Sequence, residues 1–368
     1  MAHTDILLFA EDPSAANYVA LLLPEFARRG WYARLYAAAV ACEWLRAHSV
    51  PFTGTDAETD AQTLLDQVRP GCVLTGTAEN PETLGLKLIA AARAASIPSV
   101  AFIDALMHAA YRLRGNTSDP LGFSPDALLV PDKATREAFT RLGYPGNRIE
   151  ICGHPQYDQT LALAMQWKKN GGPGAFRARL FPDLAPGRRV LTFISEGSLR
   201  YSLLPKSSPS DYAFRGRGAD NGRTKIVLEE VLDAIQVLPA RPYLVFRVHP
   251  IESAADYAEY RTEIDCFSSG GSPLELCYAS DLTVGMTSML LFEAALLGRP
   301  TLAVLAREAE ADWLPSVRSG ATPCVANHTE LRTSLARLLL EPPRAAPAAD
   351  TVVSGAIERV SRVIAGVL

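Results

Sequence analysis

Glu293 is a carboxylate set in an apolar stretch, and two hydroxyl residues precede it on the chain. The stretch SDLTVGMTSMLLFEAALLGRP, residues 280–300, predicts a strand, a turn and a buried helix. Thr287 and Ser288 fall at the N-terminus of that helix, where free backbone N–H groups and the helix dipole favour an anion. Glu293 would lie deeper on the helix and could accept hydrogen bonds from the two vicinal hydroxyls of a ribose. The alternative is a Ser/Thr helix cap, with Glu293 bonded to an arginine or a backbone amide.

Two other strand ends carry polar residues that would meet the same ligand. His249 ends the apolar strand YLVFRVHP, where it would hold a phosphate or a nucleobase edge, and a structural histidine is the alternative. Ser195, Glu196 and Gly197 follow the strand RVLTFISE, where backbone amides can approach a ligand and glycine allows a tight turn. We therefore predict that these residues belong to the nucleotide-binding set.

Arginines supply candidate phosphate contacts, namely Arg200, Arg215 and Arg247. The first two lie in a long Ser-, Pro-, Gly- and Arg-rich connection, residues 197–223, which also carries Lys206, Arg217 and Arg223. Loops of this length are usually functional or disordered. One hypothesis is a mobile lid that contacts an anionic substrate, and the other is a solvated insertion.

Two acids of the first half are candidates for proton transfer. Asp104 follows the buried strand in VAFIDALMHAAYRL and could act as a general base toward an acceptor hydroxyl, or cap a helix. Asp12, in FAEDPSAAN, is a second candidate, with a turn or capping role as the alternative.

The elements that would position these residues alternate between short β-branched strands and helices, which predicts parallel sheets with helices on both faces. SAANYVALLLPEFARRG is one such helix, with Ser14 as its expected N-cap. The Gly-, Pro- and Arg-rich residues 163–189 are interpreted as a linker. We expect an α/β protein with two doubly wound, Rossmann-like domains facing a central cleft, over 1–165 and 166–350, and a C-terminal helix over 351–368 that packs back on the first domain. Sheets of this type bind ligands outside the carboxyl ends of their strands.

The composition narrows the class of protein. The 368 residues suffice for two domains, and a net charge of −4 gives no basic excess to suggest nucleic acid. The apolar runs are too short to span a bilayer, no signal peptide is recognisable, and membrane contact is expected to be peripheral at most. The six scattered cysteines predict reduced thiols, and without Cys/His clustering no metal is expected. We expect a cytoplasmic protein, compatible with a homodimer.

The chain resembles the GT-B superfamily, including the non-hydrolysing UDP-N-acetylglucosamine 2-epimerases. GMTSMLLFEAALLGRPTLAV looks like their Asp-Ser-Gly-Gly-x-x-x-Glu-Glu segment. RIEICGHPQYDQTL is similar to their Gly-Asn-Thr-x-x-Asp segment. The run from GCVLTGT to VAFIDA is similar to the epimerase run that extends from a Gly-Asp-Thr strand end to a His-Val-Glu-Ala-Gly segment. The resemblance implies diphosphate contacts from Thr287 and Ser288 and a ribose contact from Glu293. The catalytic Asp of the epimerases falls on Thr77, SEGSLR replaces their His-Arg motif, and Asp104 is a retained acid.

Other families share fragments of this pattern. SEG, HP and TS together resemble motifs of bacterial sialyl- and Kdo-type transferases, although SEG opens the second domain here, and HP and TS are also similar to the CDP-glycerol transferases. The sequence favours a metal-independent glycosyltransferase that moves a sugar from an NDP- or CMP-sugar to the hydroxyl of an acceptor glycan or small molecule, in surface-glycan or glycoconjugate synthesis. The nucleotide sugar is a co-substrate, and no cofactor is expected. The alternatives are a UDP-N-acetyl-sugar 2-epimerase-like enzyme, and a CDP-alcohol phosphotransferase-like or non-catalytic nucleotide-binding protein.

Overall fold

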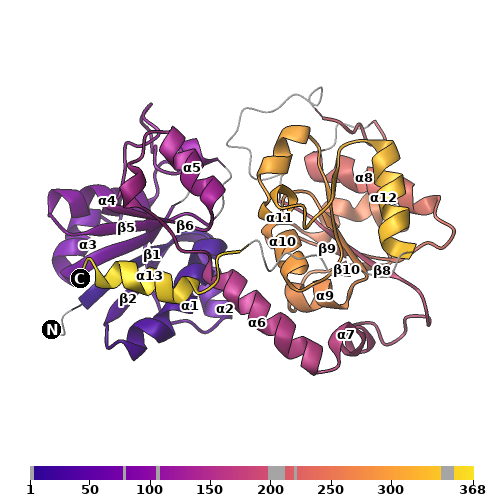
Figure 1. Cartoon of the computed structure of the whole chain (residues 1–368), viewed down its shortest axis with the longest axis horizontal. Helices are drawn as coiled ribbons and strands as arrows, with labels where there is room; N and C mark the ends of the chain where they lie inside the picture. The colour runs from indigo at the N-terminus through magenta and orange to yellow at the C-terminus, as the bar shows by residue number, and fades with distance from the viewer. Residues whose placement is uncertain (1–3, 78–79, 105–107, 198–211, 219–221, 341–351) are drawn as a thin grey trace. The chain divides into compact units, whose positions relative to one another are not determined.

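The computed structural model describes residues 4–77, 80–104, 108–197, 212–218, 222–340 and 352–368. The chain forms two compact units (Figure 1). Unit 1 comprises Met1–Gln159 with Val352–Leu368, and unit 2 comprises Thr160–Thr351.

Unit 1 is built on a seven-stranded sheet in the order β3-β2-β1-β4-β5-β6-β7, and every strand pair is parallel. The strands are β1 (Thr4–Ala10), β2 (Ala33–Ala37), β3 (Thr53–Gly54), β4 (Pro70–Gly76), β5 (Ser99–Phe102), β6 (Ala127–Val130) and β7 (Ile149–Ile151). Its helices are α1 (Pro13–Arg28), α2 (Ala39–Ala47), α3 (Ala61–Val68), α4 (Leu84–Ala94), α5 (Lys133–Arg141) and α13 (Ala356–Ala365), and α6 (Pro155–Lys169) begins in this unit.

The central strand β1 is buried on both faces from Ile6 to Ala10, which explains its apolar run over these residues. Ile6 and Leu8 pack into the cluster that includes α1 and α13, while Leu7 and Phe9 pack into the cluster formed with α3 and α4. Alternate side chains of one strand thus hold a helical layer on each face of the sheet.

Unit 2 repeats this plan with a six-stranded parallel sheet in the order β10-β9-β8-β11-β12-β13. The strands are β8 (Val190–Ile194), β9 (Tyr243–Arg247), β10 (Cys266–Ser268), β11 (Leu282–Gly285), β12 (Thr301–Val304) and β13 (Cys324–Val325). The helices are α7 (Gly172–Leu180), α8 (Arg223–Gln236), α9 (Pro273–Ala279), α10 (Met289–Leu296), α11 (Pro315–Arg318) and α12 (His328–Leu340).

In both units the strand order reverses beside the first strand, between β1 and β4 in unit 1 and between β8 and β11 in unit 2. In sheets of this kind the ligand crevice lies at that reversal, outside the carboxyl ends of the strands. The predicted α/β fold with two doubly wound, Rossmann-like domains is confirmed. The expected cleft between them stays a prediction.

Helix α13 closes the chain onto unit 1, beside α1 (Figure 1). Val360 and Ile364 are fully buried in the cluster that contains β1 and α1. The side chain of Asp158 accepts hydrogen bonds from the backbone N–H groups of Gly355, at 3.0 Å, and Ala356, at 2.7 Å. This carboxylate therefore caps the helix start and fixes its position on unit 1.

Two local predictions are wrong. The interpreted linker over 163–189 is mostly helical, in α6 and α7, because Trp167 and Phe176 pack with Tyr278 in a small core. Helix α1 starts at Pro13 rather than after Ser14, with the Asp12 side chain as its N-cap. Proline is favoured at the first helical position because its missing N–H needs no partner there.

Within the described residues, no helix is long and apolar enough to cross a membrane.

Candidate functional site

The strand reversal of unit 2 brings the residue after β8 toward the loop that follows β11. Ser288 ends this loop as the N-cap of α10, and its side-chain oxygen accepts a hydrogen bond from the Leu290 N–H at 3.2 Å. The Ser288 side chain therefore caps the helix, which is the alternative interpretation of this residue. The backbone N–H groups of Met286, Thr287 and Ser288 are not used by this cap, and all three donate to one acceptor.

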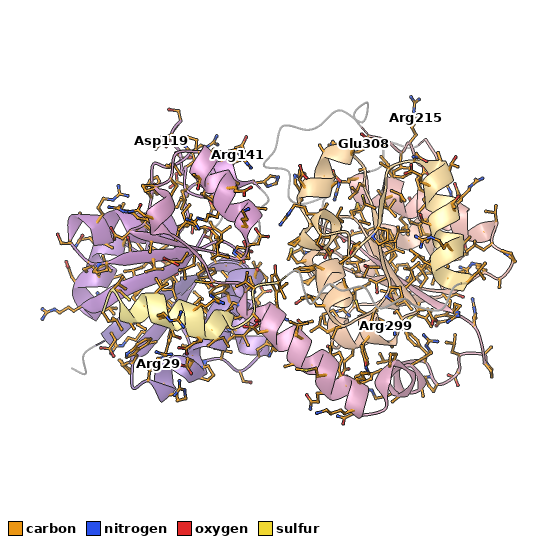
Figure 2. The ribbon with its side chains drawn as sticks, in the orientation of Figure 1. Arg29, Asp119, Arg141, Arg215, Arg299 and Glu308 are labelled. Carbon is orange, nitrogen blue, oxygen red and sulfur yellow. The ribbon has the colours of Figure 1, made fainter. Side chains whose placement is uncertain are left out.

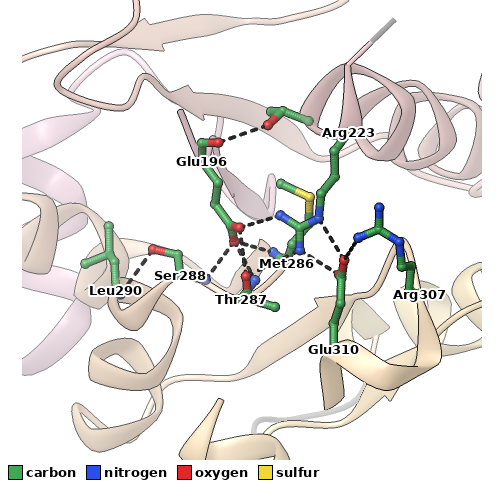
Figure 3. Close-up of polar contacts among 9 residues, drawn as sticks. Glu196, Arg223, Met286, Thr287, Ser288, Leu290, Arg307 and Glu310 are labelled. Atoms are coloured by element: carbon green, nitrogen blue, oxygen red, sulfur yellow. Dashed lines mark hydrogen bonds and ion pairs between the residues drawn. The ribbon is translucent and has the colours of Figure 1, made fainter. Parts of the chain in front are cut away.

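That acceptor is the carboxylate of Glu196 (Figure 3). Its Oε1 accepts from the N–H of Met286 at 3.1 Å, from that of Thr287, and from that of Ser288 at 2.7 Å. Its Oε2 accepts from the Thr287 hydroxyl at 3.0 Å and from Nη1 of Arg223 at 2.7 Å. The predicted residues Glu196, Thr287 and Ser288 are thus brought together, with the chain's own carboxylate in the position predicted for a phosphate.

Arg223, the first residue of α8, links Glu196 to a second acid. Its Nε and Nη2 donate to the carboxylate of Glu310 at 3.1 and 2.6 Å, and Arg307 donates to the same carboxylate at 3.1 Å (Figure 3). Burial lowers the pKa of Arg223, but the charges of Glu196 and Glu310 outweigh it, and the net pKa is raised. The guanidinium is therefore charged at every physiological pH.

Sequence reasoning named Arg223 only within the predicted lid and missed Glu310 altogether. Glu310 is fully buried in a short 3-10 helix, and no pattern in its neighbourhood marks it. Its partner Arg307 is only three residues away, but its partner Arg223 is 87 residues distant in the chain and is known only from the fold.

Ser195, Gly197 and His249 form a packed corner beside Glu196. The Ser195 hydroxyl is buried, donates to the Arg247 carbonyl at 3.1 Å and accepts from the His249 N–H at 2.7 Å. A Cβ on Gly197 would come within 2.5 Å of Ile251 and 3.0 Å of the His249 ring, so the glycine is required by close packing. Burial lowers the pKa of His249, against the opposing charges of Glu252 and Glu196, and favours its neutral imidazole. The corner supports Glu196, and its ligand contacts stay predictions.

Glu293 is half-buried on α10, one to two helical turns beyond Thr287. Its charge adds to burial in raising the pKa of the Cys277 thiol to about 12, which places the carboxylate near α9. The predicted ribose contact of Glu293 remains a prediction.

Two of the predicted phosphate arginines, Arg247 and Arg215, are directed elsewhere, and their phosphate contacts stay predictions. Arg247 donates to the Ser268 hydroxyl at 3.0 Å and to the Gly270 carbonyl, and burial lowers its pKa. Arg215 is exposed and projects away from unit 2 (Figure 2). Arg200 lies outside the described residues.

The described part of the predicted lid is fastened to unit 2. Phe214 is buried in the core, and the Gly216 N–H donates to the buried Glu230 at 2.9 Å. Arg217 makes ion pairs with Asp233 and Glu263, each at 2.7 Å. Residues 212–218 therefore pack against α8, while 198–211 and 219–221 lie outside the described residues, so the lid hypothesis stays a prediction.

The strand reversal of unit 1 gathers a second group of titratable side chains. Asp12 follows β1 and accepts the Ala15 N–H at 2.8 Å, while Asp104 follows β5 and pairs with Arg112 at 3.3 Å. Burial, followed by the charge of Asp104, raises the pKa of Asp12 to about 6. The Ala15 N–H and Arg112 act in the opposite direction. The structure thus brings the two predicted acids into one electrostatic environment.

His154 and Arg112 complete this group, and sequence reasoning assigned a role to neither. His154 is buried between Tyr18 and Tyr157, with ring centroids at 4.9 and 4.7 Å. Burial lowers its pKa to about 4, against the charge of Asp104, so the imidazole is neutral at pH 7. The pattern that singled out His249, a histidine before proline at a strand end, also marks His154.

Thr77 lies at the carboxyl end of β4, where the resemblance places a catalytic acid. It is 3% exposed, and its hydroxyl donates to the Phe102 carbonyl at 3.2 Å. Its own carbonyl accepts from Arg112 at 2.9 Å. A threonine hydroxyl does not accept protons as a carboxylate does, so Thr77 does not supply the acid–base group that the resemblance places there.

In the described part of the chain, no group of three or more His, Cys, Asp or Glu side chains has an arrangement that could hold a metal ion.

The two Rossmann-like units together have the GT-B type of fold, and structural comparison agrees. The UDP-GlcNAc 2-epimerase of Methanocaldococcus jannaschii aligns with a TM-score of 0.66 at 14% identity, over 99% of each chain. The UDP-GlcNAc 2-epimerase of Neisseria meningitidis bound to UDP-GlcNAc aligns with a TM-score of 0.64 at 14% identity, again over 99% of each chain.

Anabaena Alr3699/HepE, solved in complex with UDP and glucose, aligns with a TM-score of 0.59 at 14% identity, over 99% of this chain and 100% of its own. In sequence, no family model and no curated protein matches the chain. At these identities the likeness establishes the fold, and it confirms the resemblance to the GT-B and epimerase fold.

Proposed function

We propose that this chain is an enzyme acting on a nucleotide sugar, with the nucleotide bound to unit 2. The observation that carries the proposal is the start of α10, where the backbone N–H groups of Met286, Thr287 and Ser288 already hold an oxyanion, the Glu196 carboxylate. An oxyanion site at the strand reversal of a Rossmann-like sheet suits a nucleotide phosphate. Support also comes from neighbours of the same fold, solved with UDP-GlcNAc and UDP or with UDP.

The leading candidate reaction is epimerisation of a UDP-N-acetyl sugar. It is favoured by the full-length likeness to UDP-GlcNAc 2-epimerases. The Asp12 and Asp104 pair would supply its proton transfers, because a pKa of about 6 for Asp12 leaves both acid and base forms accessible near neutral pH. Elimination and re-addition of the nucleotide need a proton to leave and return at the epimerised carbon.

The second candidate is sugar transfer to an acceptor hydroxyl, and Thr77 favours it. With a bonded hydroxyl in place of the epimerase acid, unit 1 retains Asp104 and Asp12 as the candidate acids. A transferase needs one general base toward the acceptor, which Asp104 or Asp12 would provide.

Calorimetry with UDP, CDP, CMP and GDP tests the nucleotide proposal. We expect UDP to bind. Glu293→Ala should weaken the affinity for UDP by about tenfold, because the charge-assisted hydrogen bonds of one carboxylate are lost. Glu308→Ala, the same substitution at an exposed acid of unit 2, is the matched control (Figure 2). If none of the four binds, or if folded Glu293→Ala binds UDP as tightly as the wild type, the assignment is wrong.

Incubation with UDP-N-acetylglucosamine in deuterated water separates the two reactions. Epimerisation places deuterium at the epimerised carbon, whereas a transferase leaves the donor unlabelled and consumes it only with an acceptor. Nucleotide binding with neither exchange nor transfer across an acceptor panel would point to the non-catalytic alternative.

A further inference from the structure

Glu196 occupies its site as a bound phosphate would. Five donors converge on its carboxylate: three consecutive backbone N–H groups, the Thr287 hydroxyl and one guanidinium nitrogen of Arg223 (Figure 3). Backbone amides at a helix start and an arginine are the groups by which proteins hold phosphate. A ligand phosphate would need the same donors.

Arg223 does not depend on Glu196 for its position. Its Nε and Nη2 are held by the fully buried Glu310, which Arg307 also contacts. Nη1 is the nitrogen that donates to Glu196. If the Glu196 carboxylate withdrew, Arg223 would remain fixed by Glu310, with Nη1 directed at the vacated position.

Charge balance prevents a phosphate from joining Glu196 on these donors. Two carboxylates, Glu196 and Glu310, face two guanidinium groups, Arg223 and Arg307. A phosphate added at the same N–H groups would lie a few ångströms from the Glu196 carboxylate, and the repulsion between these like charges in a partly buried site disfavours binding beside it. The phosphate must therefore replace the carboxylate.

We infer that Glu196 is a specificity-determining residue of unit 2: its carboxylate competes with a ligand phosphate for the N–H groups of Met286, Thr287 and Ser288 and for Nη1 of Arg223. The nucleotide identity of the ligand rests on the proposed function, whereas the competition applies to any phosphate or pyrophosphate. Apparent affinity is then lowered by the fraction of molecules in which Glu196 occupies the site.

Calorimetric titration of the full chain with inorganic pyrophosphate, and separately with UDP, tests this inference. We expect Glu196→Gln to bind pyrophosphate more tightly than the wild type by about tenfold or more, because the competing charge is gone. Glu308→Gln removes the same charge from an exposed position and should bind as the wild type does. Glu196→Asp keeps the net charge but shortens the side chain, and should give a smaller gain in the same direction.

Thermal unfolding establishes that each variant is folded, and Glu196→Asp gives the decisive comparison if Glu196→Gln does not fold. Equal or weaker pyrophosphate binding by the folded variants, or no pyrophosphate binding by any protein, overturns the competition. If pyrophosphate binding tightens while UDP binds no protein, the competition stands and the nucleotide proposal fails. If UDP binds the wild type, but Glu196→Gln binds neither UDP nor pyrophosphate more tightly than the wild type does, the nucleotide proposal stands and the competition fails.

Discussion

Two carboxylates at equivalent places in the two sheets have opposite surroundings. Glu196, after β8, receives donors from its own unit on both oxygens. Asp12, after β1, accepts from backbone N–H groups at the start of α1 and has a like charge nearby in Asp104. Burial beside another acid raises the pKa of Asp12 and favours its protonated form. Asp12 is therefore the better candidate for proton transfer, whereas Glu196 is the better candidate for occupying the anion site at the start of α10.

Removing the charge of Asp104 should lower the pKa of Asp12. In Asp104→Asn we expect this pKa to fall below about 6 but to stay above the ordinary 3.8, because burial is the larger cause and remains. Carboxyl-detected NMR titration measures it, and the exposed Asp119→Asn is the control (Figure 2). An unchanged Asp12 titration in Asp104→Asn would contradict the coupling.

Stability should follow the same titration. The folded-state pKa of Asp12 lies above the unfolded-state pKa. Between pH 3.8 and about pH 6, the folded state therefore binds more protons than the unfolded state does. The free energy of unfolding therefore decreases as pH rises through that window. In Asp104→Asn this decrease should be smaller by about 1 kcal/mol, measured by urea unfolding at several pH values.

The sequence predicts strand-end residues well and their partners poorly. A polar residue after an apolar strand must lie at the carboxyl edge of the sheet, so Asp12, Asp104, Glu196 and Thr287 could be placed in advance. That Glu196 bonds the N–H of Thr287, 91 residues away, depends on tertiary packing. Local patterns carry no information about such a distance.

Among the elements, α13 shows how an amphipathic helix obtains its place. Its apolar face enters the cluster that holds β1 and α1, and Asp158 caps its first turn. The periodic pattern of GAIERVSRVIAGVL suffices to predict a helix. By contrast, the Gly- and Pro-rich composition around α6 and α7 is typical of a linker. It does not indicate that Trp167 and Phe176 pack against Tyr278.

Val360→Ala should destabilise unit 1. The deletion leaves a cavity at a fully buried position, which costs about 2 kcal/mol. Val237→Ala removes the same atoms from a side chain that is 61% exposed and should change stability by less than about 0.5 kcal/mol. Urea unfolding measures both, and equal effects would show that α13 does not pack as described.

At the scale of the whole molecule, the alternation of strands and helices was enough to predict two doubly wound sheets. Each unit needs only short parallel strands with a helix between them, and such connections are right-handed and local. The short edge strands β3, β10 and β13 were not foreseen, because two or three residues carry no periodicity. The proposed reaction depends on few side chains, such as the residue at position 77, and the architecture alone does not determine it.

Unit 1 is assembled from two separate stretches of chain, with the whole of unit 2 between them. During synthesis on a ribosome, the apolar face that α13 covers would emerge early and stay uncovered while residues 160–351 are translated, for roughly 10 to 40 seconds. A nascent chain of this protein thus carries an unfinished first unit beside a second unit that can already complete its own core. Chaperone binding to translating ribosomes should therefore centre on the α1 surface and end when the Val352–Leu368 segment leaves the exit tunnel.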